Sequence, residues 1–261
     1  MGKRSIIITS AASAYGAACV RAFAAAGYRL ILADESESAA RALLDGLGEK
    51  HADSPVVIGS AANKLQIHNI IAEGIETYGR IDGLVHIAAI GDDTEFTDQS
   101  EEFLQTLVSQ SLMGALLINQ AIVRQFLKQD AAAESGIASG GVIVNIVQSG
   151  LVETGGVAGA TIQAGVEAMS KTLAVRYAKE AIRANCISAG LISGAPLDDA
   201  VLKSGRKTSA AHRLGDVQNV ADAATYLAGE KAQFVSGTTL NVDGGGILTF
   251  NSIGQGNGST A

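Results

Sequence analysis

Short apolar runs alternate along this chain with longer segments of helical periodicity, and this alternation is the feature that most restricts its fold. A continuous apolar run of about four to eight residues is typical of a strand buried on both faces, because a strand with one wet face alternates apolar and polar side chains. Strands separated by amphipathic helices form right-handed βαβ units, and these build a parallel sheet with helices on both faces. The sequence therefore predicts the α/β class, with strands at 5–9, 28–33, 55–58, 83–88, 141–147, 183–188 and 238–242 and helices at 14–26, 36–48, 62–79, 100–128, 157–179 and 217–229.

One domain accounts for the length of 261 residues, since neither an internal repeat nor a linker interrupts the alternation. Residues 1–250 are expected to form this domain. The Gly-, Ser- and Asn-rich stretch 251–261 is expected to form a tail that frays or orders against a partner. Small and polar residues replace the periodic pattern at 130–140 and 193–212, which predicts a surface loop and a mobile lid.

Charge and composition exclude several classes of partner. The net charge is -7 and no strongly basic stretch occurs, which argues against nucleic acid. No run of about 18 apolar residues predicts a membrane span, and the start of the chain has no signal-peptide pattern. Cys19 and Cys186 lie in apolar segments and are expected to be free thiols of a cytoplasmic protein. No metal site is expected, because metal-ligand spacing is missing among His51, His68, His86 and His212.

Three stretches of the C-terminal half resemble the short-chain dehydrogenase/reductase family. The stretch "HRLGDVQNVADAATYLAGEKAQFVSGTTLNVDGGG" from His212 resembles the last helix and strand of that family almost residue for residue. "RANCISAGLISGAP" from Arg183 and "GGVIVNIVQSG" from Gly140 resemble its sixth and fifth strands. The resemblance covers nearly the whole chain. It implies a single Rossmann-type, doubly wound domain with a seven-stranded parallel sheet, an assembly of two or four subunits, and hydride transfer with NAD(P).

The resemblance also assigns four catalytic positions, and each holds a different residue here. The family uses a Tyr as acid/base, a Lys four residues later that lowers the pKa of this Tyr, a Ser that orients the carbonyl, and an Asn that holds a water. A phenol with a pKa near 10 needs such a nearby positive charge to work at neutral pH. The corresponding positions of this chain are Gly159 for Tyr, Gln163 for Lys, Gln148 for Ser and Ser111 for Asn.

A shifted alignment does not restore the pair. No tyrosine occurs between Tyr78 and Tyr177, and no lysine occurs between Lys128 and Lys171. Only the serine could be recovered by a shift, as Ser149. The sequence therefore predicts that no residue at these positions is catalytic.

The stretch "TSAASAYG" at 9–16 stands where the family carries its phosphate-binding glycines. Ser10 and Ala14 replace two of them, and Gly16 remains. A residue other than glycine is strained by about 1–2 kcal/mol where the backbone needs a positive φ. Tyr15 adds a large ring to this loop and is expected to crowd the pyrophosphate. Asp34 stands where an acidic residue would bind the adenosine ribose of NAD, although an acidic residue also commonly ends a strand or caps a helix.

Other cofactor contacts of the family are altered in the same way. Ser60 stands in place of an Asp that binds adenine, and His86-Ile87-Ala88-Ala89 replaces Asn-Asn-Ala-Gly after the fourth strand. The sequence therefore predicts that no cofactor binds tightly. The residues of this vestigial site are Ser10, Ala14, Gly16, Asp34 and Ala88.

These replacements together predict a catalytically inactive pseudoenzyme, because the loss of one positioned acid/base group already slows a reaction by about 10²–10⁴-fold. Two alternatives stay open. One is an enzyme with a relocated active site at the ends of three strands, lined by Tyr15, His86, Gln148 and Ser149. His86 also fits a buried core position. The other alternative is an NAD-binding sensor without chemistry, which Asp34 supports.

The predicted role of an inactive chain is to support an active subunit. Apolar residues wrap more than one face of the helix 100–128, and small residues recur along 157–179, which permits close helix approach. In the family these two helices commonly form the interface between subunits. The chain resembles the inactive subunits of heterotetrameric hydroxyacyl-CoA dehydrogenases of anaerobic toluene degradation. The expected partner is an active, NAD-dependent homologue of the same family, bound through these helices, with no nucleic acid and no membrane involved.

Overall fold

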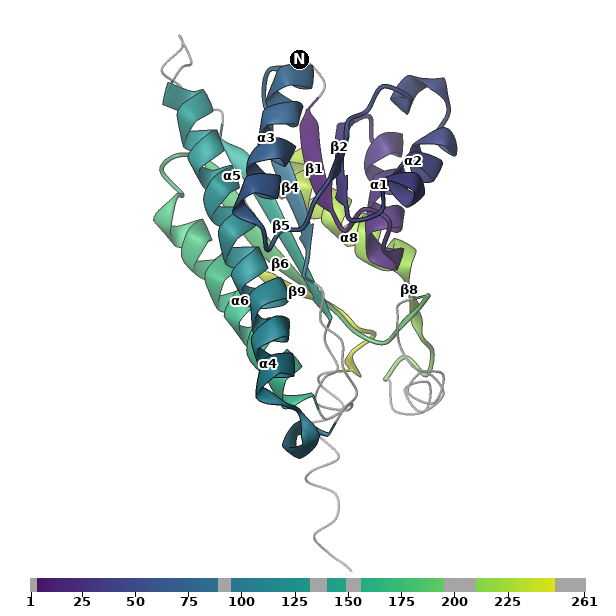
Figure 1. The fold of residues 1–261 in the computed structure, drawn as a ribbon, viewed down its shortest axis with the longest axis vertical. Coiled ribbons are helices and arrows are strands. Elements are labelled where there is room, and N and C mark those ends of the chain that lie inside the picture. Colours follow the sequence, from purple (N-terminus) through teal and green to yellow (C-terminus); the bar gives the residue numbers. More distant parts are fainter. Residues whose placement is uncertain (1–3, 89–94, 132–139, 149–155, 195–209, 247–261) are drawn as a thin grey trace, which may run out of the picture.

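Seven parallel strands form a central sheet in the order β3-β2-β1-β4-β5-β6-β9 (Figure 1). The structure, a computed structural model, describes residues 4–88, 95–131, 140–148, 156–194 and 210–246. The prediction of a doubly wound α/β domain with seven parallel strands is thereby confirmed. The strands are β1 (Ser5–Thr9), β2 (Arg29–Asp34), β3 (Val56–Ile58), β4 (Gly83–Ile87), β5 (Gly141–Gln148), β6 (Ile182–Ala189) and β9 (Thr239–Val242).

Helices cover both faces of the sheet, as Figure 1 shows. One layer holds α1 (Ala14–Ala25), α2 (Glu37–Asp45) and α8 (Val217–Ala228), and the other holds α3 (Lys64–Tyr78), α5 (Gly114–Ala131) and α6 (Val157–Arg176). The short helix α4 (Glu101–Leu107) precedes α5. Among the described residues, β7 (Ile192–Ser193) and β8 (Gly215–Asp216) form a second, two-stranded sheet beside the first.

The strands are apolar runs because each of them is covered on both sides. Every residue of β1 and of β4 is buried, and neighbouring residues alternate between the two helical layers. Ile6 and Ile8 of β1 belong to the core under α1 and α8, whereas Ile7 belongs to the core under α3 and α5. The same alternation decides on which side of the sheet each polar residue of the candidate site lies.

The helices begin where a polar side chain can accept a hydrogen bond from their first turn. Ser13, Ser36, Asn63 and Ser100 each do so at the starts of α1, α2, α3 and α4. Asp216 and Asn219 form a reciprocal capping box at the start of α8. These caps explain why the observed helices start within about two residues of the predicted ranges.

The helix predicted at 100–128 is present, but it is not α-helical throughout. A π-helical segment, Val108–Met113, separates α4 from α5 and places Ser111 in a buried position. A π segment adds one residue to a turn, and the spacing of apolar residues does not reveal such an insertion. The stretch Glu101–Gln129 is long and apolar enough to cross a membrane by length and composition, a test that core helices of soluble proteins also pass.

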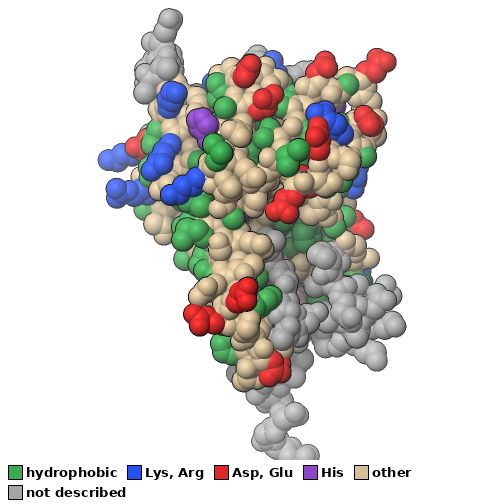
Figure 2. Space-filling view, in the orientation of Figure 1, with side chains coloured by type: hydrophobic (Ala, Val, Ile, Leu, Met, Phe, Trp, Pro, Cys, Tyr) green, Lys and Arg blue, Asp and Glu red, His purple; other side chains and the backbone are tan. Residues whose placement is uncertain are grey.

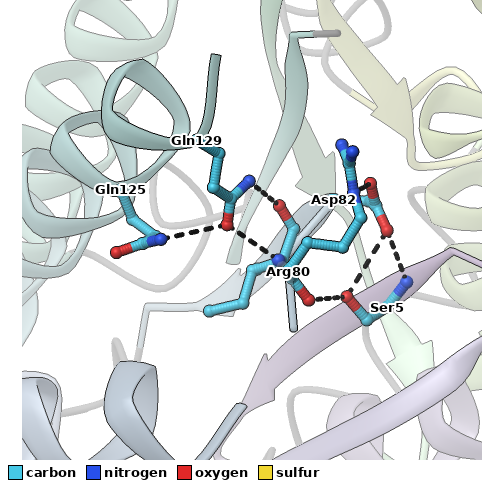
Figure 3. A network of polar contacts seen from close by, with 6 residues as sticks. Ser5, Arg80, Asp82, Gln125 and Gln129 are labelled. Carbon is cyan, nitrogen blue, oxygen red and sulfur yellow. Dashed lines mark hydrogen bonds and ion pairs between the residues drawn. The ribbon is translucent and has the colours of Figure 1, made fainter. Parts of the chain in front are cut away.

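Polar contacts fix the amino ends of the central strands (Figure 3). The amide of Ser5 donates to Asp82 Oδ2 over 2.8 Å, and the Ser5 hydroxyl donates to the Arg80 carbonyl oxygen. Gln129, near the end of α5, bonds to both the amide and the carbonyl of Ile81 over 2.9 and 2.8 Å. The network ties β1, β4 and α5 together at this edge, so that their opposite ends are held in register.

Both cysteines are free and buried, which confirms the thiol prediction. Burial raises the pKa of Cys19 and of Cys186 to about 12, so both thiols are protonated at neutral pH. The tail predicted at 251–261 and most of the predicted loop at 130–140 and lid at 193–212 lie outside the described residues.

Candidate functional site

The carboxyl ends of β1, β4 and β5 form the edge where a ligand is expected. β1 pairs with β2 on one side and with β4 on the other, so the strand order reverses at β1. In open α/β sheets the crevice at such a reversal is where ligands bind. The loop 10–16 lies above β1 and leads into the amino end of α1, which favours an anion, although the Gly16 amide of its first turn already donates to Ser13 Oγ.

The loop 10–16 is strained at one of the two positions expected. Ser10 has φ 47°, in the left-handed region that favours glycine, whereas Ala14 is the first residue of α1 and is unstrained. Gly16 must stay a glycine, because a Cβ there would lie 2.1 Å from the carbonyl oxygen of Ser10. The loop therefore keeps the close approach of backbone to helix that a phosphate-binding loop needs.

Asp34 fastens this loop to the end of β2. Its Oδ2 accepts from the amide of Ala12 over 2.7 Å, and its Oδ1 accepts from the amide of Ser36 over 2.9 Å. Ser36, not Asp34, caps α2. A carboxylate has about four lone-pair sites, so two remain for further donors.

The sequence analysis expected the Tyr15 ring to crowd the pyrophosphate. The structure places the ring away from the loop instead. This ring packs in the core under α1 and α8 and is only 6% exposed. Its hydroxyl donates to Gln148 Oε1 at the end of β5 over 3.1 Å. Gln148 Nε2 in turn donates to the carbonyl oxygen of Gly190, just after β6, over 3.1 Å. This chain of two bonds, called here the Tyr15–Gln148–Gly190 bridge, spans the carboxyl edge from α1 to the turn after β6.

Burial raises the pKa of Tyr15 well above its ordinary value of about 10. The phenol is therefore neutral at physiological pH, and its proton is harder to remove than that of an exposed tyrosine. The expectation that the ring blocks a pyrophosphate is not supported by this placement. Tyr15 and Gln148 were both candidates for a relocated active site, and the structure brings these two together.

His86 lies on the other side of the sheet. It is two residues from Leu84 on β4 and so faces the same side of the sheet, toward α3 and α5. It is 2% exposed, its Nδ1 lies 2.8 Å from Thr9 Oγ1, and burial lowers its pKa to about 4. This placement fits the core position that the sequence analysis also considered. Ser149, the fourth candidate, lies outside the described residues.

A second polar group lies under α6. Gln163, at the family's lysine position, donates from Nε2 to Glu167 Oε1 over 2.9 Å and to Ser188 Oγ over 3.1 Å. Thr239 donates weakly to Glu167 Oε2 over 3.4 Å. Gly159, at the family's tyrosine position, is buried in the first turn of α6, and Ala88 is buried after β4. Sequence reasoning missed the contacts of Glu167, for which no motif gives a signal, and of Gly190, although Gly190 lies in the stretch "RANCISAGLISGAP" that resembles the family. In the described ranges, no three His, Cys, Asp or Glu side chains are placed to hold a metal ion.

Comparison with known proteins decides the family. A family model described as enoyl-(acyl carrier protein) reductase matches residues 11–246. The chain belongs to the short-chain dehydrogenase/reductase family. An uncharacterised oxidoreductase of Schizosaccharomyces pombe is 32% identical over 93% of this chain and 90% of its own length. The 3-oxoacyl-(acyl-carrier-protein) reductase FabG of Thermotoga maritima is 30% identical over 93% of this chain and 97% of its own. A 3beta-hydroxysteroid dehydrogenase of Eggerthella lenta is 28% identical over 93% and 94%.

Solved structures agree on the fold. A short chain dehydrogenase from Bacillus anthracis superposes with a TM-score of 0.83 at 27% identity, over 94% of this chain and 97% of its own. A 3-ketoacyl-(acyl-carrier-protein) reductase from Brucella melitensis, solved with NADH, gives the same TM-score at 23% identity, over 94% and 98%.

These comparisons overturn the prediction of an inactive chain that only supports another subunit. The family and the relatives across more than nine-tenths of the chain are oxidoreductases, and the structure places the Tyr15 hydroxyl beside Gln148 at the carboxyl edge. The sequence analysis preferred an inactive chain because it looked for the catalytic tyrosine on the helix 157–179, in the family's register. Its alternative, a relocated site lined by Tyr15, His86, Gln148 and Ser149, contains the two residues that the structure joins by a hydrogen bond.

Proposed function

We propose that this protein is an NAD-linked oxidoreductase in which Tyr15 is the proton donor to a ketone. The observation that carries the proposal is the hydrogen bond between Tyr15 and Gln148, since Gln148 stands where the family's carbonyl-orienting serine would be. Two of the relatives named above are, by their names, a 3-oxoacyl reductase and a 3beta-hydroxysteroid dehydrogenase, and these substrate classes share a secondary alcohol or ketone carbon. A ketone of this kind is the substrate class proposed here.

The residues around the loop 10–16 fit the adenosine diphosphate part of a nicotinamide dinucleotide. Gly16 leaves room for the backbone, the first turn of α1 offers amides to the pyrophosphate, and Asp34 has free lone pairs for the ribose hydroxyls. When bound, the nicotinamide ring supplies or accepts a hydride. A carboxylate at this position repels a 2′-phosphate, so NAD(H) is proposed rather than NADP(H).

Proton transfer from Tyr15 needs a source that restores the phenol. A neutral phenol gives its proton to the oxygen of a ketone as that oxygen gains negative charge, and it becomes a phenolate that must then take a proton from water. Burial of Tyr15 raises its pKa and makes this phenolate costly, whichever direction the reaction takes. Ketone reduction starts from the neutral phenol and should run at neutral pH, whereas alcohol oxidation starts from the phenolate and should run only under alkaline conditions.

The direct test is turnover by the purified chain with NADH or NADPH and a panel of 3-oxoacyl thioesters and 3-ketosteroids. We expect reduction with NADH to exceed reduction with NADPH by at least about tenfold, because a 2′-phosphate would sit beside the Asp34 carboxylate. The initial rate of the decrease in absorbance at 340 nm measures the reduction with each cofactor. No turnover with any ketone, or a preference for NADPH, contradicts the proposal.

We also propose that a homologous subunit of the family binds the outer surface of α4, α5 and α6. Exposed apolar side chains on this surface support it: Val108, Met113, Leu116, Val157 and Val175. Figure 2 shows Lys and Arg side chains gathered at the upper left, over the ends of α5 and α6, and acidic side chains lower down over α4. The exposed cations there are Arg124, Lys128, Lys171, Arg176 and Lys179. A cytoplasmic location, supported by the two free thiols, completes this proposal.

Leu116→Asp should split such a complex and leave the chain folded. Leu116 is 42% exposed in the single chain, so a carboxylate there is solvated, whereas an interface would bury it without a partner. We expect at least about a hundredfold loss of subunit affinity, as measured by light scattering after size exclusion with and without the co-expressed homologue. Tyr226→Asp, at 46% exposure on α8, is the matched control. Equal behaviour of the two variants would argue against this interface.

A further inference from the structure

A groove opens at the amino edge of the sheet, where β1, β2 and β4 begin, and it is separate from the candidate site described above. Its volume is about 1220 Å³, which is enough for a small organic molecule, since such sites usually measure about 300–1,000 Å³. Arg29 lines the groove and is the first residue of β2, whereas Asp34 of the proposed dinucleotide site is the last. A strand rises about 3.3 Å per residue, so about 16 Å of strand separates the two residues.

Arg29 is a half-buried cation that has no counter-ion in the part of the chain that the structure describes. Its guanidinium lies over the ring of Tyr78, 5.5 Å from the ring centroid. No described carboxylate comes within 4.0 Å of its nitrogens, and no described group accepts a hydrogen bond from them. A partly buried charge is usually paired, so a ligand anion at Arg29 would supply the missing partner.

The two other arginines that line the described groove do have carboxylate partners. Arg4 pairs with Glu230 over 3.5 Å, and Arg80 pairs with Asp82 over 2.6 Å (Figure 3). Asp82 also accepts from the amide of Ser5, so its oxygens are committed to the network at this edge. These carboxylates therefore stay with their own partners when an anion approaches the guanidinium of β2.

The ring of Tyr78 gives this guanidinium a fixed support. The Tyr78 hydroxyl donates to the carbonyl oxygen of Leu30 over 3.1 Å, which holds the ring in place. A guanidinium over an aromatic ring is held by a cation–π contact and keeps its N–H groups in its own plane. Such a planar fork binds a carboxylate or a phosphate through two parallel hydrogen bonds.

The groove also has an apolar wall beside the guanidinium. It consists of the ring of Tyr28 and the short side chains at the end of α1: Ala22, Ala25 and Ala26. We propose that this groove binds a flat aromatic anion, with its carboxylate or phosphate on Arg29 and its ring against this wall. The chain has a net charge of -7 and repels anions at long range, so binding there depends on the local fork. The proposal is independent of the reaction at the carboxyl edge.

The test titrates the full chain with benzoate and with phenyl phosphate and follows binding by saturation-transfer NMR. The two probes share one ring and differ in the anionic group, so they distinguish a carboxylate site from a phosphate site. We expect at least one of them to bind with a Kd below about 1 mM. Benzyl alcohol has the same ring without the charge and should bind at least about tenfold more weakly. Saturating NADH should displace neither probe, because it is proposed to bind at the opposite edge.

Arg29→Gln should weaken binding of the probe by at least about tenfold, because the charged, two-bond contact is lost. Arg29→Lys keeps a cation over Tyr78 but lacks the planar fork, so its affinity should fall by at least about threefold. Arg41→Gln is the matched control, since Arg41 is an exposed arginine of α2 outside the groove and pairs only with Glu37. It should bind the probe as the wild type does. Denaturant unfolding of each variant shows that it is folded.

Four results would overturn the proposal. The first is a Kd above about 1 mM for both anions, and the second is equal affinity for benzyl alcohol. The third is displacement by NADH, which would place the probe at the carboxyl edge. The fourth is wild-type affinity in Arg29→Gln, or a loss in Arg41→Gln as large as its own. If Arg29→Gln does not fold, Arg29→Lys decides the matter, since wild-type affinity there would mean that the fork is not used.

Discussion

Tyr15→Phe is expected to lower kcat for ketone reduction by about 10²–10⁴-fold, the range for loss of a positioned acid/base group. Phenylalanine keeps the ring that packs under α1 and α8 and removes only the hydroxyl that donates to Gln148. KM for NADH should change little, because the hydroxyl lies away from the loop 10–16 and Asp34. Stability should fall by about 1 kcal/mol, since one hydrogen bond is lost and the Gln148 oxygen loses its donor.

The pH dependence gives this prediction a second readout. Burial raises the pKa of Tyr15, so the acid form that donates the proton is present throughout the neutral range. The rate of reduction should therefore be flat from about pH 6 to about pH 9 and fall only above the ordinary phenol pKa of about 10. Tyr226→Phe, at an exposed position of α8, should keep both the rate and the profile. A Tyr15→Phe variant with the wild-type kcat would show that another group supplies the proton.

The fold could be predicted from the sequence because its main elements depend on local patterns. Ile6, Ile7 and Ile8 form an unbroken apolar run, and such a run fits only a strand covered on both faces. Helix starts follow from caps such as Ser13 and Asn63. The π segment before α5 could not be predicted, because one added residue in a turn leaves the apolar spacing almost unchanged.

The site was harder to predict, because it depends on where side chains point. The sequence places Tyr15 in the first turn of α1, but the burial of its ring in the core and its bond to Gln148 depend on how α1, α8 and β5 pack. Gln148 reaches Tyr15 only because β5 continues to residue 148 and ends beside the turn after β6. Comparison with the family's motif therefore identified the residues that replace its catalytic residues. It did not reveal the contacts that these replacements make with one another.

Gly16→Ala is expected to lower the free energy of unfolding by about 3 kcal/mol and to abolish measurable binding of NADH. An added Cβ would lie 2.1 Å from the Ser10 carbonyl oxygen and 2.8 Å from Ala11 Cα, so backbone rather than a side chain would have to move. Ser10 already has a positive φ and has little freedom to give way. A shift of this loop would also move the first-turn amides of α1 and would disturb the bond between the Ala12 amide and Asp34. The proposed dinucleotide site depends on both features.

Gly46→Ala is the matched control for this substitution. Gly46 has φ −67° at the end of α2, and its added Cβ would approach no atom closer than 3.4 Å. Alanine there should leave stability unchanged or raise it by about 0.4–1 kcal/mol through the unfolded state. Denaturant unfolding monitored by circular dichroism separates the two variants. If Gly16→Ala and Gly46→Ala were equally stable, the Ser10 carbonyl oxygen would have to lie farther from Gly16 in solution than the structure places it. If Gly16→Ala is destabilised and still binds NADH like the wild type, the loop is needed for packing alone, and the dinucleotide would have to be held elsewhere on the carboxyl edge.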